Sequence, residues 1–417
     1  MKRAVRINIL LIIICMILNI VGCGTQYLGG SRDEKWQKDL SYLQKALPKK
    51  HVDLFFNMSE DDFNGQIDEL KNNVSKLNDE EVVAGIYKIV ADVSDAHTKA
   101  YRNYEKRYPL QFYYFNNDIY LINTTEEYSE AMNCRLKKIN GIDIYKVEEL
   151  LTPLIAKENE WNIKKMLPSL LMRPDILKGV NISNNAEDSV FTFENFNNEE
   201  FDIKINSVDL SSEDNSVSWI VTDNGDETIP LYRQNSEMSY WYKYIEEKET
   251  LYFKYNSCTN DEDCGNIEDI IEQILEFIDE NNVDKLVIDM RNNSGGSDGY
   301  LNPFIDGLKE RNINTSNRLF VVIGRQTFSA AIIDACLLKE GTNAFFIGEP
   351  TSGKPNHYGQ VSHFKLPNSR IDIAYSTKRC TLFSDEGDAF IPDKEIDISI
   401  DDYINKEDPI MNYILNN

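Results

Sequence analysis

The chain is short of basic residues, histidine and paired cysteines. Lys and Arg number 44 against 69 Asp and Glu, so the 417 residues carry a formal net charge of −25. Nucleic-acid binding requires basic residues to neutralise phosphate, and this balance argues against it. With four histidines and no CxxC pair, no metal site is predicted. A hydrophobic content of 41% is typical of a globular protein, and 417 residues are enough for two or three domains.

The cysteines leave one question open. Cys258 and Cys264 flank a short acidic loop. In an oxidising compartment, this spacing allows a small disulfide. Free thiols are the alternative, and the sequence does not choose between them.

The N-terminus holds the one long apolar run. A basic start is followed by an almost wholly apolar stretch over residues 7–21. This arrangement is typical of a secretory signal. Gly22 before Cys23 resembles the lipobox of bacterial lipoproteins, in which Cys23 is lipidated. We expect a signal peptide over 1–22, a tether over 23–32 and a folded part outside the cytoplasm, anchored to the cell membrane by lipid. An uncleaved transmembrane anchor is the alternative.

A helical domain is predicted over residues 33–105. Apolar residues recur there at helical spacing, and Ser59 and Asn78 are suited to cap the second and third helices. The first helix is expected to end at Pro48. Three short amphipathic helices predict a small bundle, which leads into the sequence Asp-Ala-His-Thr at 95–98.

Two further regions follow. Residues 106–235 alternate apolar and polar side chains, which indicates a β-rich region. Residues 236–417 alternate strands with helices, and their continuous apolar strands are expected where helices cover both faces of a sheet. The strands expected in this last region are 251–255, 286–290, 319–323 and 345–347, with helices at 267–278 and after Ser329, and a hairpin over 361–375.

Ser329 is the candidate nucleophile. It follows a buried strand and a short turn, and Ala330 leaves its hydroxyl accessible. At a helix N-terminus the amide of Ala330 is free, and the helix dipole favours negative charge. A turn at Gly295 or Gly296 offers a second amide for an oxyanion hole. Serine is also a favoured N-cap, so the local pattern alone allows a purely structural role.

Four motifs in order carry a family resemblance: DMRNNSGG, GRQTFSAA, GEPTSGK and FIPD. Together they resemble the carboxyl-terminal processing (tail-specific) protease family. The resemblance implies an α/β (α+β multidomain) protein with a ββα-superfold (ClpP/crotonase-like) protease core, preceded by the helical bundle and a degenerate PDZ-like region. It also implies a serine peptidase that acts on polypeptides without a metal or cofactor.

The resemblance leaves two arrangements for the base. Lys354 follows Ser329 by 25 positions, as the base does in the processing proteases proper. Tricorn-like members instead use a histidine and a later glutamate, for which His97 and Glu386 are the candidates. A lysine requires burial to act as a base, whereas a histidine titrates near neutral pH.

The remaining expectations concern substrate and activity. His357 and Tyr358 are expected to contact substrate, and His363, in a predicted strand, to pack or to lie at the surface. Ser352 and Tyr358 stand where the family usually has phenylalanine and glutamine, which motivates one alternative: a catalytically inactive peptide- or ligand-binding lipoprotein. A crotonase-like acyl-transfer enzyme or hydratase is the other alternative.

Overall fold

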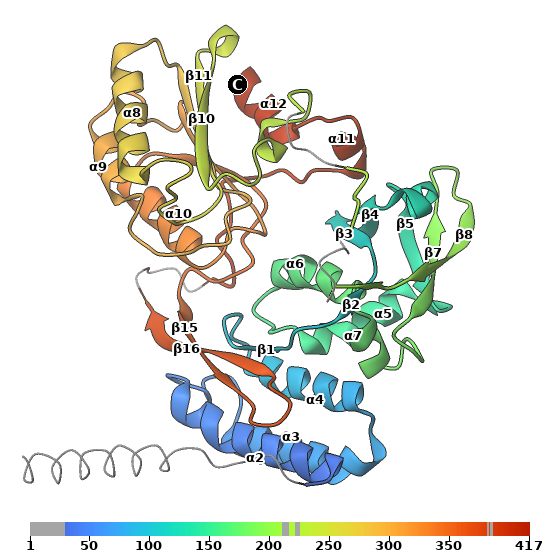
Figure 1. Cartoon of the computed structure of the whole chain (residues 1–417). Coiled ribbons are helices and arrows are strands. Elements are labelled where there is room, and N and C mark those ends of the chain that lie inside the picture. Colours follow the sequence, from blue (N-terminus) through green and yellow to red (C-terminus); the bar gives the residue numbers. More distant parts are fainter. Residues whose placement is uncertain (1–29, 211–216, 222–225, 382, 384–386) are drawn as a thin grey trace, which may run out of the picture.

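The computed structural model describes residues 30–210, 217–221, 226–381, 383 and 387–417. Cys23 and Glu386 lie outside them. Figure 1 shows three parts: a helical bundle at the N-terminus, a β-rich part in teal and green, and a sheet with helices towards the C-terminus. None of the helices within these residues combines the length and apolar character that a membrane crossing requires.

The N-terminal bundle has the three predicted helices: α2 (Arg32–Lys50), α3 (Glu60–Asn73) and α4 (Asp79–Ala91). Ser59 and Asn78 cap α3 and α4, each accepting a hydrogen bond from a first-turn amide. The prediction that the first helix ends at Pro48 was wrong. Proline removes one amide donor from a helix, and α2 still continues to Lys50, where the amide of His51 donates to the carbonyl of Leu47 at 3.0 Å.

The second part is built on an antiparallel sheet in the order β3-β4-β5-β7-β8, with β6 paired to β5. Three helices pack beside it, and two of them were not predicted. The strands are β3 (Leu110–Phe115), β4 (Asp118–Thr124), β5 (Arg135–Ile139), β6 (Ile142–Asp143), β7 (Asp188–Glu194) and β8 (Glu200–Asn206), with the small pair β2 (Lys106–Arg107) and β9 (Val208–Asp209). The helices are α5 (Ile144–Leu151), α6 (Glu160–Leu171) and α7 (Pro174–Gly179).

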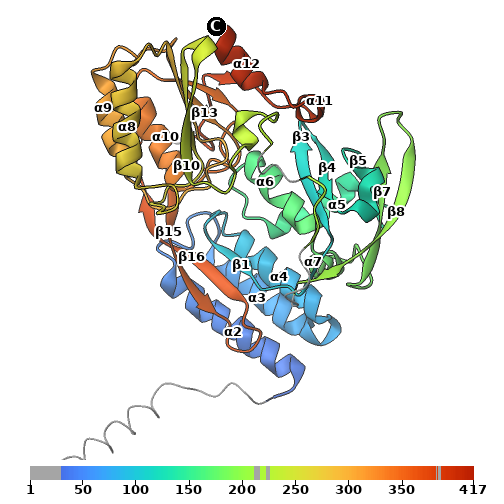
Figure 2. The ribbon, with the colours of Figure 1, turned by 45° about the horizontal axis from the view of Figure 1, so that its top comes forward.

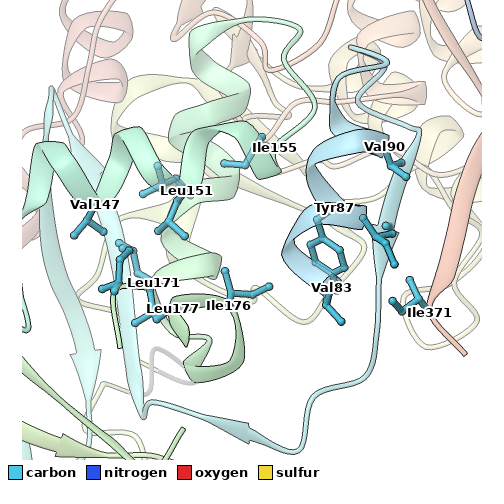
Figure 3. Close-up of a cluster of buried hydrophobic side chains, with 14 of the residues drawn as sticks. Val83, Tyr87, Val90, Val147, Leu151, Ile155, Leu171, Ile176, Leu177 and Ile371 are labelled. Atoms are coloured by element: carbon cyan, nitrogen blue, oxygen red, sulfur yellow. The ribbon is translucent and has the colours of Figure 1, made fainter. Parts of the chain in front are cut away.

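One continuous core joins the first two parts. Figure 3 shows Val83, Tyr87 and Val90 of α4 in the same buried cluster as Leu151 of α5 and Leu177 of α7. The bundle and the β-rich part are therefore stabilised by shared apolar burial.

The C-terminal part is a six-stranded sheet in the order β10-β11-β12-β13-β14-β17, parallel except for β10. Its strands are β10 (Tyr240–Ile245), β11 (Thr250–Tyr255), β12 (Lys285–Asp289), β13 (Leu319–Ile323), β14 (Phe345–Gly348) and β17 (Lys394–Glu395). Its helices are α8 (Ile267–Glu280), α9 (Asn302–Lys309), α10 (Ala330–Gly341), α11 (Ile400–Ile404) and α12 (Pro409–Asn416).

Helices cover both faces of this sheet, as its apolar strands predict (Figure 2). On β12, Leu286 and Ile288 pack in the cluster that includes α8, α9 and α10. Val287, between them, packs in the cluster that includes α12. Because successive side chains of a strand point to opposite faces, side chains on both faces of β12 are buried.

A small third sheet connects the C-terminal part to the bundle. The strands β15 (His357–Lys365) and β16 (Asp372–Cys380) form the predicted hairpin, and β16 pairs with β1 (Lys99–Tyr101). In Figure 1 the hairpin extends from the C-terminal part to α2 and α4. This sheet brings the loop before β1 next to the start of β15, two segments far apart in sequence.

The two cysteines in question are free thiols in the structure. Cys258 is buried, with its Sγ 3.4 Å from Asp334 Oδ2, and Cys264 lies 3.3 Å from Asp261 Oδ2. Each thiol is held by a different carboxyl group, so no disulfide closes the acidic loop.

Candidate active site

Ser329 has the backbone geometry of an exposed nucleophile. It follows β13 and a short turn and immediately precedes α10, with φ 55° and ψ −126°. A positive φ is costly for a non-glycine residue and persists only where the surroundings impose it. The side chain does not cap the helix, so the structure does not support the N-cap role that the sequence allowed. A serine on such a strand-to-helix turn presents its hydroxyl to a ligand.

The glycine turn lies directly against Ser329. A Cβ built on Gly295 would be 2.8 Å from Ser329 Cβ and 3.1 Å from the amide nitrogen of Ala330. The Gly295 amide donates to Asn293 Oδ1 at 2.9 Å, whereas the amides of Gly296 and Ala330 donate to no acceptor in the described part of the chain. Gly296 and Ala330 are therefore the amides available to an oxyanion, and Gly295 provides the space beside the serine.

Replacing Gly295 tests this contact. In Gly295→Ala the new methyl group would also lie 2.7 Å from the carbonyl oxygen of Phe328. We expect hydrolysis to fall about 100-fold, because the displaced turn no longer presents its amides. Gly299→Ala is the matched control: its φ is also positive, yet its Cβ would approach only Asn302 Nδ2, at 3.6 Å. Equal activity of the two variants, measured as kcat/KM, would contradict the assignment.

The Asp-Ala-His-Thr loop is organised by Asp95, which is fully buried. Its Oδ2 accepts hydrogen bonds from His51 Nε2 at 3.1 Å, Thr98 Oγ1 at 2.5 Å and Ser376 Oγ at 2.6 Å. Its Oδ1 accepts from the His97 amide at 3.0 Å. Burial alone would raise the pKa of Asp95, but the hydrogen bonds from His51, Ser376 and Thr98 lower it below its usual value. Asp95 thus fixes the backbone that carries His97.

Asp95→Ala is expected to destabilise the protein by about 3 kcal/mol, because it leaves four buried donors without their acceptor. The measurement is the free energy of unfolding in urea. Asp92→Ala, three residues earlier at the C-terminal end of α4 and only half-buried, is the control. A change of similar size in both variants would exclude the role of Asp95 as the organising residue.

His97 is 6% exposed and is held by ring contacts. It stacks on Phe328, the residue before Ser329, with ring centroids 4.5 Å apart, and on His357 at 5.3 Å. Burial lowers the pKa of His97 to about 4, and His357 acts in the same direction while Asp95 opposes it. Its Nδ1 lies 3.9 Å from Asp95 Oδ1, and neither ring nitrogen has a hydrogen-bond partner in the described chain. His97 is therefore neutral at neutral pH.

His357 lies at the start of β15. His357 and Ser329 line the same cavity, whose volume is about 530 Å³. Gly296, Ala330 and Gly359 also line this cavity. His357 Nδ1 donates to the carbonyl oxygen of Lys354 at 2.9 Å, and burial lowers the pKa of His357. The ring is thus held as the tautomer with its proton on Nδ1.

The other predicted residues lie elsewhere. Lys354 Nζ pairs at 3.0 Å with Asp388, an exposed carboxylate, and a third of the lysine side chain is exposed. Tyr358 does not line the cavity: its hydroxyl donates to Asp53 at 2.8 Å, and its ring packs on Phe56. Glu386 is not among the described residues, so its relation to His97 stays a prediction. His363 is half-exposed and bonds to Asp372.

Two half-buried ionisable residues near His97 had no signal in the sequence. Lys165 of α6 lies over the Phe328 ring at 4.4 Å and contacts Ser352 Oγ at 3.4 Å, and burial lowers the pKa of Lys165 to about 8. Glu158 accepts from the amide of Ala96 at 3.1 Å, and burial raises the pKa of Glu158 to about 7. Both come from the loop and helix that the sequence did not predict.

A second cavity lies apart from this site. It measures about 490 Å³ and is lined by Tyr113 of β3 and by Arg291 and Arg325 of the C-terminal part. It includes none of the predicted site residues.

No protein-family model matches this sequence, and no curated protein sequence matches it. Solved structures do. Mature CPAF in complex with lactacystin is 12% identical, with a TM-score of 0.66 over 92% of this chain and 97% of that chain. Mature CPAF has a TM-score of 0.65 at 12% identity, and a serine-to-alanine mutant of CPAF has a TM-score of 0.63 at 11% identity. Each match covers 92% of this chain and 96% of that chain.

These likenesses show the fold. The chain has the mixed α/β fold of CPAF along nearly its whole length, and the predicted fold class is confirmed. The PDZ-like character of the β-rich part stays a prediction.

Proposed function

We propose that this chain is an extracytoplasmic, lipid-anchored serine endopeptidase of the carboxyl-terminal processing type. The observation that carries the proposal is the geometry of Ser329: a positive φ at a helix start, with the free amides of Gly296 and Ala330 beside it. The fold shared with CPAF supports it. The substrate is a polypeptide.

His97 is the base in this proposal. The proton of Ser329 passes to Nε2 of His97, since Nδ1 lies on the side of Asp95. The alkoxide adds to the peptide carbonyl, whose oxyanion is bound by the amides of Gly296 and Ala330. The amine then leaves with the proton from His97, and an acyl group remains on Ser329. Lys354 is a weaker candidate because its ammonium is paired with Asp388.

A binding lipoprotein with the same fold is the second candidate. The observation in its favour is that the Ser329 hydroxyl makes no hydrogen bond to His97 or to any other group in the described chain. Such bonds are often open in structures without substrate and close when substrate binds. Activity therefore has to be measured.

The test is digestion of unfolded casein by the soluble chain from residue 24 onward. We expect peptides with new N-termini inside the casein sequence, as an endopeptidase produces. A folded protein that releases no peptides from casein or from a mixed peptide library would favour the binding function. Globomycin, which blocks lipoprotein signal cleavage, should retain the unprocessed precursor in cells if Cys23 is lipidated.

A further inference from the structure

We propose that His357 is a second catalytic histidine, which activates the water that hydrolyses the acyl group on Ser329. This inference rests on the proposed function. It adds a residue to the pair of Ser329 and His97 and assigns the hydrolysis of the acyl group to that residue.

The two stacked imidazole rings, of His97 and His357, differ in their access to solvent and to the cavity. Both ring nitrogens of His97 are closed to solvent and have no partner in the described chain. His357 lines the cavity that also holds Ser329, Ala330 and Gly296. A water molecule that attacks an acyl group on Ser329 enters through this cavity, so it meets His357 and not His97.

The hydrogen bonding of His357 is that of a base. Its Nδ1–H is donated to the Lys354 carbonyl at 2.9 Å, which leaves the lone pair on Nε2. Nε2 bonds to no described residue and is not among the nitrogens closed to solvent. It lies on the side of Gly359, where an added Cβ would be 3.8 Å from it. Glycine at that position keeps the space beside Nε2 open.

The stack with His97 fixes the ring plane of His357, at 13° between the two rings. In serine hydrolases a second group commonly fixes the tautomer of the base, and here the carbonyl of Lys354 does so. This carbonyl depends on the loop conformation and not on the lysine side chain. Lys354 thus acts through its backbone.

The water oxygen bonds to the acyl carbon while its proton passes to Nε2 of His357. The carbon–Oγ bond then breaks, and the proton from Nε2 goes to Oγ, which restores the Ser329 hydroxyl and releases the acid. General base catalysis of this kind contributes about 100-fold or more to the rate.

The experiment separates acylation from deacylation with a p-nitrophenyl ester, whose nitrophenol is released as the acyl-enzyme forms. His357→Asn is the variant, because its side-chain amide can still donate to the Lys354 carbonyl while Nε2 is lost. We expect the nitrophenol burst to persist, the steady-state rate to fall about 100-fold, and the acyl-enzyme to accumulate in intact-mass spectra. His363→Asn, in the same strand but away from the cavity, should change neither phase.

His357→Ala provides a second readout that a purely structural role would not give. Added imidazole should restore steady-state turnover in this variant, but not in Ser329→Ala. Two results would overturn the role of His357. One is the loss of both burst and turnover in His357→Asn, together with no imidazole rescue of His357→Ala; the other is no change in either phase. A wild-type protein without a Ser329-dependent burst would instead overturn the proposed function itself.

Discussion

Ser329→Ala is expected to reduce hydrolysis of casein to the background, a fall of at least about 10⁴-fold in kcat. The variant loses the hydroxyl that attacks the substrate in the proposed mechanism, on a residue that lines the cavity with Gly296 and Ala330. Folding should be unchanged, because the Ser329 side chain caps no helix. The measurements are kcat for a fluorogenic peptide and the thermal unfolding midpoint.

Ser297→Ala is the matched control. Ser297 lines the same cavity, but its backbone lies in the glycine turn and not at a helix start. Its substitution should change kcat severalfold at most. Retained hydrolysis in Ser329→Ala, or its loss in Ser297→Ala alone, would place the nucleophile elsewhere.

His97→Asn is expected to lower kcat about 10³-fold, within the range that general base catalysis supplies. The base acts in its neutral form. Because burial lowers the pKa of His97 to about 4, the neutral form prevails through neutral pH. The burst rate of the wild-type protein, which measures acylation, should therefore stay constant around neutral pH. It should fall only as the pH approaches about 4.

Lys354→Ala is the control for the choice of base. Its ammonium faces an exposed carboxylate, so kcat should change by less than about threefold, as for other surface ion pairs. The opposite pattern, with activity lost in Lys354→Ala and kept in His97→Asn, would restore the lysine arrangement and remove His97 from the mechanism.

Local patterns predicted most of the elements of the fold. Ser59 and Asn78 cap the helices they were expected to cap, and the apolar strands of the C-terminal sheet are covered on both faces. The helix α6 was missed because Pro168 lies within it, and proline inside a pattern usually ends a helix. Pro48 misled the prediction for α2 in the same way.

The site was predicted in part. Ser329 and Ala330 are adjacent in sequence. Gly296 follows a neighbouring strand, and a parallel sheet brings the ends of its strands together. The pairing of β1 with β16 brings His97 to His357, and no local pattern encodes a contact over such a separation. Tyr358 was expected beside substrate, but successive residues of a strand face opposite ways, and its hydroxyl lies at Asp53.

The most direct test of the account is labelling with diisopropyl fluorophosphate, a probe that phosphorylates activated serine hydroxyls. We predict one adduct on the intact wild-type protein, located at Ser329 by peptide mapping, with no adduct in Ser329→Ala and much slower labelling in His97→Asn. A folded wild-type protein that stays unlabelled, or that is labelled at another serine, would contradict the claim that Ser329 is an activated nucleophile.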